Sequence, residues 1–125
     1  VTIGNSVKVI GMSAFSGCTS LTSVTIPDSV TSIYGNAFSD CTSLETATLG
    51  KGVESIGGYA FYNCSKLKTV TIGANMTEIG EMAFANCGSL TDVYYAGTEA
   101  QWKAIKIGES NARLTDATIH YNHTA

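Results

Sequence analysis

Residues 44–66, LETATLGKGVESIGGYAFYNCSK, contain a pattern that recurs through most of the chain. The pattern is Leu-x-x-Val-x-Ile followed by Val-x-x-Ile-Gly-x-x-Ala-Phe-x-x-Cys, and the next unit begins at Leu67. The repeat length of 23 residues is marked by the four cysteines, Cys18, Cys41, Cys64 and Cys87, and no insertion interrupts the units. An uninterrupted repeat of this length predicts stacked coils, in which each position lies above its equivalent in the coil before.

Each unit predicts three local structures. The Val-x-Ile step alternates between inward and outward positions, which predicts a strand, and equivalent strands are expected to run parallel, ~4.8 Å apart, as one long sheet. The Val-x-x-Ile segment suits a second short extended segment on the opposite side. Ala-Phe-x-x-Cys is too short for a full helix and predicts one turn of α or 3₁₀ helix. The residue before each Cys is of a type that tolerates left-handed backbone where a turn ends: Gly17, Asp40, Asn63 and Asn86.

The period stops after Val93-Tyr94-Tyr95. Thr98, with Gln101 three residues later, is a capping-box signature for a helix that should run to about Ile105 or Lys106. This helix is expected to replace the usual half-repeat. Its Trp102 is the best candidate to plug the open end of the core, since solenoids need an atypical terminal unit.

The strand template returns near the end of the chain. Leu114, Ala117 and Ile119 each lie 24 residues after an equivalent position in the unit before. We therefore predict that a last coil closes the sheet. The chain divides into residues 1–95, with four 23-residue repeats preceded by a partial one, and residues 96–125, a C-terminal capping unit.

Composition and charge limit the classes of function. The chain has 125 residues, 44% of them hydrophobic and 14% charged, which suits one domain with a buried core. The net charge of −3 argues against nucleic acid or an anionic membrane as the main partner. No apolar run approaches the ~20 residues of a membrane helix, so we expect no membrane insertion. The chain opens inside a strand-like pattern at Val1-Thr2-Ile3, and we expect it to be part of a longer protein.

The repeat resembles the leucine-rich repeat, and its Ile-Gly-x-x-Ala-Phe-x-x-Cys half is similar to the BspA-like leucine-rich repeats of bacterial surface proteins. The Asn/Cys ladder of the general form is missing, because Ser29, Gly52 and Asn75 occupy its place. The resemblance implies a curved solenoid with its parallel sheet on the concave face, in a secreted or surface-anchored bacterial protein. Members of this family are often adhesion or host-interaction proteins. No catalytic residues come with the resemblance.

The cysteines have three possible roles. Zinc sites use closely spaced cysteine pairs, whereas this spacing places one Cys in each coil. Adjacent coils bring the Cα atoms within disulfide range, so a bridge such as Cys18–Cys41 stays an open alternative. We favour a row of small buried thiols beside the phenylalanines, because every coil has the same Cys whether or not it finds a partner.

Catalysis has few candidate residues. The only histidines are His120, at an outward strand position, and His123, in a tail that should fray, and we interpret both as solvated side chains. No Ser or Cys has a nearby His base, and no glycine-rich phosphate loop is present. We therefore predict no catalytic residues, no metal site and no cofactor.

The outward positions of the predicted sheet form a candidate binding face. Its residues are Thr25, Thr46, Thr48, Thr69, Thr71, Asp92, Tyr94, Asp116 and Thr118. Strand propensity alone explains many exposed threonines. Repeat proteins also commonly bind partners on an extended concave sheet, and aromatic residues such as Tyr94 are enriched at interface hot spots. A threonine ladder also suggests an ice-binding face, but Tyr94 interrupts it.

The leading hypothesis is a monomeric, non-enzymatic module that binds a protein or glycan through the concave sheet, on the bacterial cell surface or outside the cell. The alternative is a structural spacer that projects another domain, and a hydrolase or an ice-binding protein is more distant. Three tyrosines at variable repeat positions, Tyr34, Tyr59 and Tyr62, are either local packing substitutes or an exposed aromatic cluster.

Overall fold

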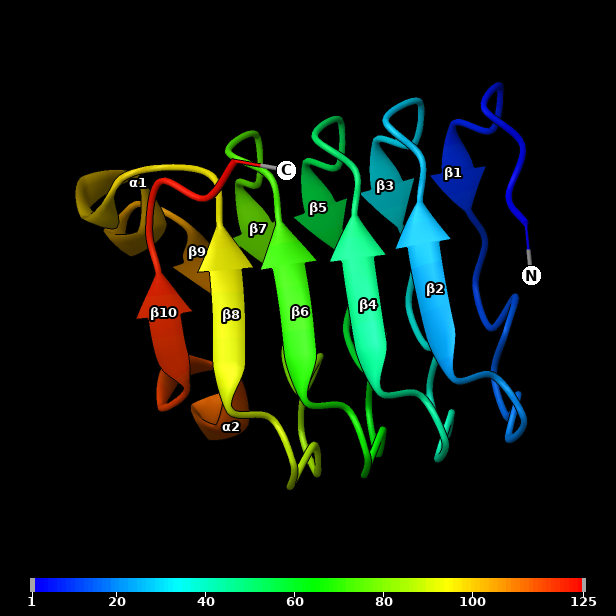
Figure 1. The fold of residues 1–125 in the computed structure, drawn as a ribbon. Helices are drawn as coiled ribbons and strands as arrows, with labels where there is room; N and C mark the ends of the chain where they lie inside the picture. Colours follow the sequence, from blue (N-terminus) through cyan, green and yellow to red (C-terminus); the bar gives the residue numbers. More distant parts are fainter. Residues whose placement is uncertain (1, 125) are drawn as a thin grey trace.

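The coils of the chain form two parallel five-stranded sheets in the computed structural model, which describes residues 2–124. Figure 1 shows the first sheet in front, and we call it the long-strand sheet. Its strands are β2 (Ser23–Ile26), β4 (Thr46–Leu49), β6 (Thr69–Ile72), β8 (Asp92–Tyr95) and β10 (Thr118–His120). The short-strand sheet consists of β1 (Val9–Ile10), β3 (Ser32–Ile33), β5 (Ser55–Ile56), β7 (Glu78–Ile79) and β9 (Lys106–Ile107).

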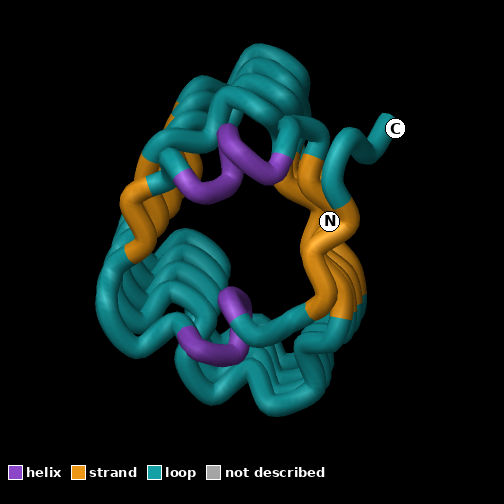
Figure 2. The backbone as a smooth tube through the Cα atoms, turned by 90° about the vertical axis from the view of Figure 1, so that its left-hand side faces the viewer, coloured by secondary structure: helices purple, strands orange, loops and turns teal. Residues whose placement is uncertain are grey.

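The parallel-sheet solenoid is confirmed, but the prediction of a single sheet is wrong. The short extended segments lie opposite the long strands, as expected, and they also hydrogen-bond to one another from coil to coil (Figure 2). Equivalent positions pair in register, for example Thr25 with Thr48 and Ile33 with Ile56. The predicted strand-like start is also wrong, since Thr2 and Ile3 form no strand, while Val1 lies outside the described residues.

The core between the two sheets is a set of side-chain ladders. Phe15, Phe38, Phe61 and Phe84 stack with ring centroids 5.1–5.2 Å apart and nearly parallel planes. Valine, isoleucine and leucine side chains from both sheets are buried against them. Because each ladder is made of apolar side chains at equivalent positions, each coil completes the hydrophobic packing of its neighbours.

The segment around Ala-Phe-x-x-Cys is a stack of turns, and the predicted helical turn is absent from it. In one coil, the Ala37 N–H donates to Tyr34 O within the coil, whereas the next N–H, that of Phe38, donates to Ala60 O of the next coil. The backbone therefore shares its hydrogen bonds between coils, which a helix does not do. Left-handed backbone occurs at two positions per unit. One is the predicted position directly before Cys, as at Asn63 (φ 60°). The other lies five residues before Cys, as at Tyr59 (φ 62°).

The corner glycines let neighbouring coils approach closely. A Cβ atom on Gly57 would lie 2.6 Å from the Gly35 backbone nitrogen, and one on Gly80 would lie 2.4 Å from the Gly58 nitrogen. Tyr34 occupies the same column one coil earlier, and its side chain is 49% exposed. Tyr59 and Tyr62 are half-buried and contact each other edge to face, so the three tyrosines do not form one exposed cluster.

The last coil differs from the others by two short helices (Figure 1). Helix α1 (Glu99–Lys103) begins with the predicted capping box, in which the Thr98 hydroxyl accepts from the Gln101 N–H and the Gln101 side chain accepts from the Thr98 N–H. It ends earlier than predicted, and its Trp102 is buried edge to face on Tyr95. Helix α2 (Ala112–Thr115) follows β9 and takes the place of the turn stack.

Two predictions for this coil are wrong. Helix α1 does not replace the half-repeat, because Ile107 still pairs with Ile79 in the short-strand sheet. The register of the last strand is also shifted, since Ile119 pairs with Val93, where Ala117 was expected. The reason is that Leu114 belongs to α2 and is buried by that helix, so the strand begins later. Among residues 2–124, no helix is both long and apolar enough to span a membrane.

Candidate functional site

Two rows of side chains point outward from the long-strand sheet. The first, which we call the outer row, consists of Thr25, Thr48, Thr71, Tyr94 and His120. The second, the flanking row, consists of Ser23, Thr46, Thr69, Asp92 and Thr118. Most residues of the predicted binding face therefore lie together. Thr118 lies in the flanking row rather than the outer row, because of the register shift, and Asp116 lies off the sheet as the C-cap of α2.

The threonine hydroxyls of the outer row differ from those of Thr31 and Thr77, which lie just before short strands. Those two donate their hydroxyls to carbonyls of the preceding coil, Lys8 O and Glu54 O. On the short-strand sheet, the Ser55 hydroxyl donates to that of Ser32. Within residues 2–124, the hydroxyls of Thr25, Thr48 and Thr71 have no protein hydrogen-bond partner. These three hydroxyls can therefore donate and accept hydrogen bonds with solvent or with a ligand that lies on the sheet.

An aromatic cluster ends the outer row. The rings of Tyr94 and His120 stack with centroids 4.5 Å apart and an interplanar angle of 11°, and the His123 ring lies 5.2 Å from Tyr94 on a tilted plane. His120 Nε2 lies 2.8 Å from Asp92 Oδ1. This hydrogen bond, together with one from the Thr91 hydroxyl, holds the pKa of Asp92 below its ordinary value of 3.8.

The prediction that both histidines are simply solvated is wrong. The tail does not fray at His123, because the His123 N–H donates to Tyr95 O at 2.9 Å and the Asn122 N–H donates to Gly97 O at 2.8 Å. The sequence does contain a signal for His120. Thr118-Ile119-His120 alternates as Asp92-Val93-Tyr94 does, and this alignment places His120 beside Tyr94. His123 has no such signal, since its position depends on how the tail folds back.

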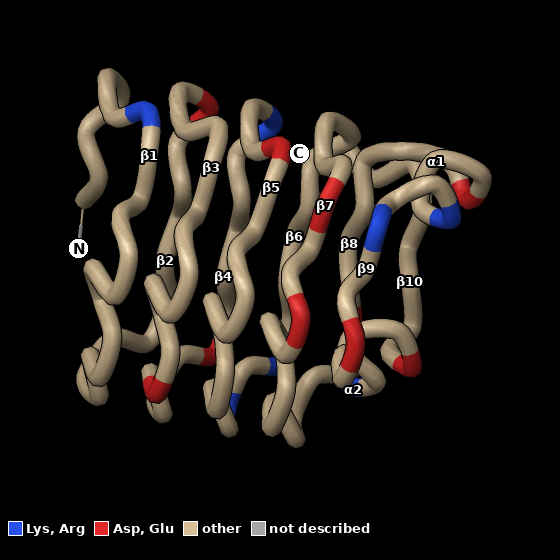
Figure 3. The backbone as a smooth tube through the Cα atoms, turned by 180° about the vertical axis from the view of Figure 1, so that it is seen from behind, with Lys and Arg blue, Asp and Glu red and all other residues tan. Residues whose placement is uncertain are grey.

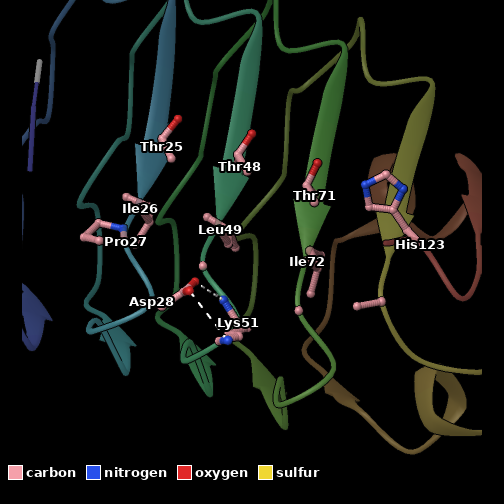
Figure 4. A pocket seen from close by; sticks show the side chains of 13 residues that line it. Thr25, Ile26, Pro27, Asp28, Thr48, Leu49, Lys51, Thr71, Ile72 and His123 are labelled. Atoms are coloured by element: carbon pink, nitrogen blue, oxygen red, sulfur yellow. Dashed lines mark hydrogen bonds and ion pairs between the residues drawn. The ribbon is translucent and has the colours of Figure 1, made fainter. Parts of the chain in front are cut away.

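A shallow depression of about 440 Å³ lies where β2, β4 and β6 end (Figure 4). Thr25, Thr48 and Thr71 line one side of it and His123 lines one end. The remaining lining residues are Ile26, Pro27, Asp28, Leu49, Gly50, Lys51, Ile72, Gly73 and Ala96. Lys51 and Asp28 interact in two ways. Asp28 Oδ1 accepts a hydrogen bond from the Lys51 backbone N–H at 2.9 Å, and Asp28 Oδ2 lies 4.0 Å from Lys51 Nζ as an ion pair.

Charge is nearly absent from the strands of this sheet. Asp92 is the one acidic residue in its five strands, which contain no Lys or Arg. The opposite side of the solenoid differs, since Glu78 and Lys106 lie on β7 and β9 of the short-strand sheet (Figure 3). The long-strand sheet thus presents a largely uncharged surface.

The cysteines form the predicted row of free thiols. Cys41, Cys64 and Cys87 are buried, and each Sγ donates to a phenylalanine carbonyl of the preceding coil, at 3.1–3.2 Å. Hydrogen bonds with the Cys41 and Cys87 thiols, together with burial, raise the pKa of Cys64. A thiol whose pKa is raised in this way, as that of Cys64 is, is a poor nucleophile. Among residues 2–124, no three His, Cys, Asp or Glu side chains are grouped so that they could hold a metal ion.

Comparisons with known proteins agree with this architecture. A family model described as the BspA type leucine rich repeat region matches residues 1–110 in six copies. A leucine-rich cell surface protein from Faecalibacterium prausnitzii A2-165 has a crystal structure that is similar with a TM-score of 0.65, at 33% identity over 83% of this chain and 34% of that chain. The Treponema (T. pallidum) leucine rich repeat protein is similar in fold, with a TM-score of 0.60 at 24% identity over 82% of this chain and 63% of that chain.

The chain thus spans about a third of the length of the first of these proteins and less than two thirds of the second. No curated protein matches it.

Proposed function

Because this chain belongs to the BspA-type leucine-rich repeat family, we propose that it is a non-enzymatic binding module of a bacterial cell-surface protein. The module binds its partner through the long-strand sheet, in adhesion or host interaction. The cell-surface location is supported by the similarity to a leucine-rich cell surface protein.

The observation that carries this proposal is the open hydroxyls of Thr25, Thr48 and Thr71. Some hydroxyls in the repeat instead contribute to the fold by bonding the preceding coil, as those of Thr31 and Thr77 do. The outer-row hydroxyls form no bond within the described chain, although they lie in register on adjacent strands. A row of solvent-facing polar groups that ends at an aromatic cluster has the composition of a recognition surface, where aromatic anchors supply affinity and polar groups supply orientation.

The test is a binding screen with the chain immobilised. Matrix proteins, mucins and purified glycans are passed over it, and over a double variant of the sheet, Tyr94→Ala with Thr71→Lys. The matched control, Tyr34→Ala with Thr19→Lys, changes the same residue types and the same charge at exposed positions outside the long-strand sheet. We expect at least one partner whose binding is lost in the sheet variant and kept in the control.

Three other outcomes would contradict the proposal. An equal loss of binding in both double variants would mean that the partner contacts another surface, or that the added positive charge alone weakens binding. If nothing bound, a spacer that holds another domain away from the cell would be the better explanation, because a continuous stack of paired coils is suited to that role. Turnover of a glycan or peptide by the chain would contradict both functions.

A further inference from the structure

We propose that the depression at the ends of β2, β4 and β6 binds a short neutral glycan, with its sugar rings beside Thr25, Thr48 and Thr71 and its end against His123. This inference rests on the proposed function and specifies the ligand of the same face.

The hydroxyl row fits the polar groups of a sugar. A threonine hydroxyl both donates and accepts, as sugar hydroxyls do, so each of the three can exchange hydrogen bonds with a ring above it. The three side chains recur at the strand spacing of ~4.8 Å, so they offer the same contact repeatedly along the solenoid axis. A ligand with repeated hydroxyl-bearing units matches that arrangement better than one with a single polar group.

The apolar part of the depression fits the C–H faces of sugar rings. Pro27 and the threonine methyl groups supply aliphatic surface, and the His123 ring closes one end (Figure 4). The Tyr94 ring lies 5.2 Å from that ring, and the His120 ring stacks on Tyr94. The backbone bond from His123 N–H to Tyr95 O further fixes the position of His123. The end wall is therefore held in place before a ligand arrives, which lowers the entropy cost of binding.

Charge favours a neutral ligand. Lys51 and Asp28, which line the depression, form an ion pair with each other. Asp92, which lies beyond the His123 end of the depression, pairs with His120. The three lining threonines carry no charge. The chain as a whole has a net charge of −3, which disfavours an anionic glycan at long range.

A peptide strand is a poorer fit. Extended peptides bind sheets by pairing with the free edge of a strand, whereas two of the three strands below the depression, β4 and β6, are already paired on both sides and only β2 lies at an edge. A protein partner usually contributes charged or large apolar side chains as anchors. The threonines of this face offer neither an opposite charge nor a large apolar pocket for such side chains.

The test is a calorimetric and NMR titration of the chain with neutral hexasaccharides, cellohexaose, xylohexaose and mannohexaose, and with an oligogalacturonate and a sialylated oligosaccharide as anionic probes. We expect at least one neutral probe to bind and to shift the methyl resonances of Thr25, Thr48 and Thr71. Thr48→Val keeps the size of the side chain and removes its hydroxyl, so binding should weaken roughly 2- to 10-fold, the value of one hydrogen bond.

Three further variants separate the contributions. Thr77→Val removes a hydroxyl that serves the fold and should leave binding unchanged. His123→Ala should weaken binding more than Thr48→Val does, whereas His123→Phe should retain most of it, because the ring face is kept. Equal weakening by Thr77→Val and Thr48→Val would show that the effect comes from stability and would overturn the proposed contact.

The outcomes also separate this inference from the proposed function. Stronger binding of the anionic probes, or binding that moves no threonine methyl group, overturns the neutral-glycan site. If no oligosaccharide binds at millimolar concentration while a protein from the screen binds and is lost in the sheet variant, the glycan inference fails and the binding module stands. If neither class binds, both fail.

Discussion

The Phe84 N–H donates to Asn111 Oδ1 at 3.0 Å, and this side chain ends the hydrogen-bond ladder of the turn stacks. In the three preceding coils, the equivalent phenylalanine N–H donates at 2.7 Å to an alanine carbonyl of the next coil. No such coil follows the last turn stack within the described residues, since α2 takes its place. Asn111, which is 4% exposed, supplies the missing acceptor, and its Nδ2 donates to Gly80 O and Gly108 O.

We therefore predict that Asn111→Ala destabilises the chain by about 2–3 kcal/mol, because it leaves the buried Phe84 N–H and the Gly108 carbonyl without these partners. Urea unfolding followed by circular dichroism measures this. Asn111→Asp keeps the acceptor for Phe84 and loses the donor, so its cost should also be substantial. Asn75→Ala is the control, since Asn75 is exposed and makes one bond, to Lys51 O. Equal costs at positions 111 and 75 would show that Asn111 does not cap the ladder.

The phenylalanine ladder predicts a large difference between the core and the sheet face. Phe61 is fully buried between Phe38 and Phe84, so Phe61→Ala should cost about 3–5 kcal/mol. Thr48→Ala on the outer row should stay within about 0.5 kcal/mol. Thermal and urea unfolding of both variants would give the comparison, and similar values would mean that the assignment of inward and outward positions is mistaken.

Close contact between coils predicts that substitution of Gly80 is costly. A Cβ at Gly80 would lie 2.4 Å from the Gly58 backbone nitrogen, and backbone cannot move aside as a flexible side chain does. Gly80→Ala should therefore destabilise by about 1–3 kcal/mol, the usual cost of overpacking. Gly11→Ala is the matched control, because a Cβ there meets nothing within 4 Å. The prediction fails if the two substitutions have the same midpoint in urea.

The hydrogen bond between His120 and Asp92 predicts a dependence of stability on pH. The pKa of Asp92 is lower in the folded chain than in the unfolded chain, so the unfolded carboxyl is protonated first as the pH falls. Its contribution to stability is present above the unfolded value of 3.8 and is lost as the pH falls through the folded value. The difference in unfolding free energy between the native chain and Asp92→Asn should therefore shrink as the pH falls through and below 3.8. Asp116→Asn, at the C-cap of α2, is the control, and a difference that did not change with pH would argue against the bond.

Burial of the thiols predicts a graded reactivity. Cys18 is half-buried in the first coil, whereas Cys41, Cys64 and Cys87 are fully buried. A thiol reagent should therefore label Cys18 first under native conditions, and the other three should react only when the chain unfolds. Mass spectrometry after timed labelling would show the order. Stability should not change when a reductant is added, and a loss of stability would reveal disulfides between coils.

The repeat made most of the fold predictable. Identical residues at a spacing of 23 require stacked coils, and the alternation in Thr46-Ala47-Thr48-Leu49 correctly separates inward from outward side chains. The left-handed residue before each cysteine was predictable, because Gly, Asp and Asn tolerate that backbone. The left-handed backbone at Tyr59 and Met82 was not, since neither residue type favours it and the bonds to the next coil impose it.

The candidate site was only partly predictable. The threonines of the outer row follow from the period, but the cluster of Tyr94, His120 and His123 depends on where the period ends. The Leu114-x-x-Ala117-x-Ile119 pattern fits a strand template, and only the burial of Leu114 within α2 shows that the strand begins later.

By itself, the sequence determined the solenoid, the core ladders, the buried thiols and the threonine face, because a repeated unit has the same neighbours in every coil and local pattern is enough to place it. The tertiary structure alone decided the pairing of the short strands into a second sheet, the capping by Asn111 and the position of His123. The short strands follow the 23-residue period, but only the path of each coil brings them within hydrogen-bonding distance of one another. The other two depend on contacts between segments that share no period, such as Asn111 with Phe84 and His123 with Tyr95, and no local pattern encodes the free energy of such contacts.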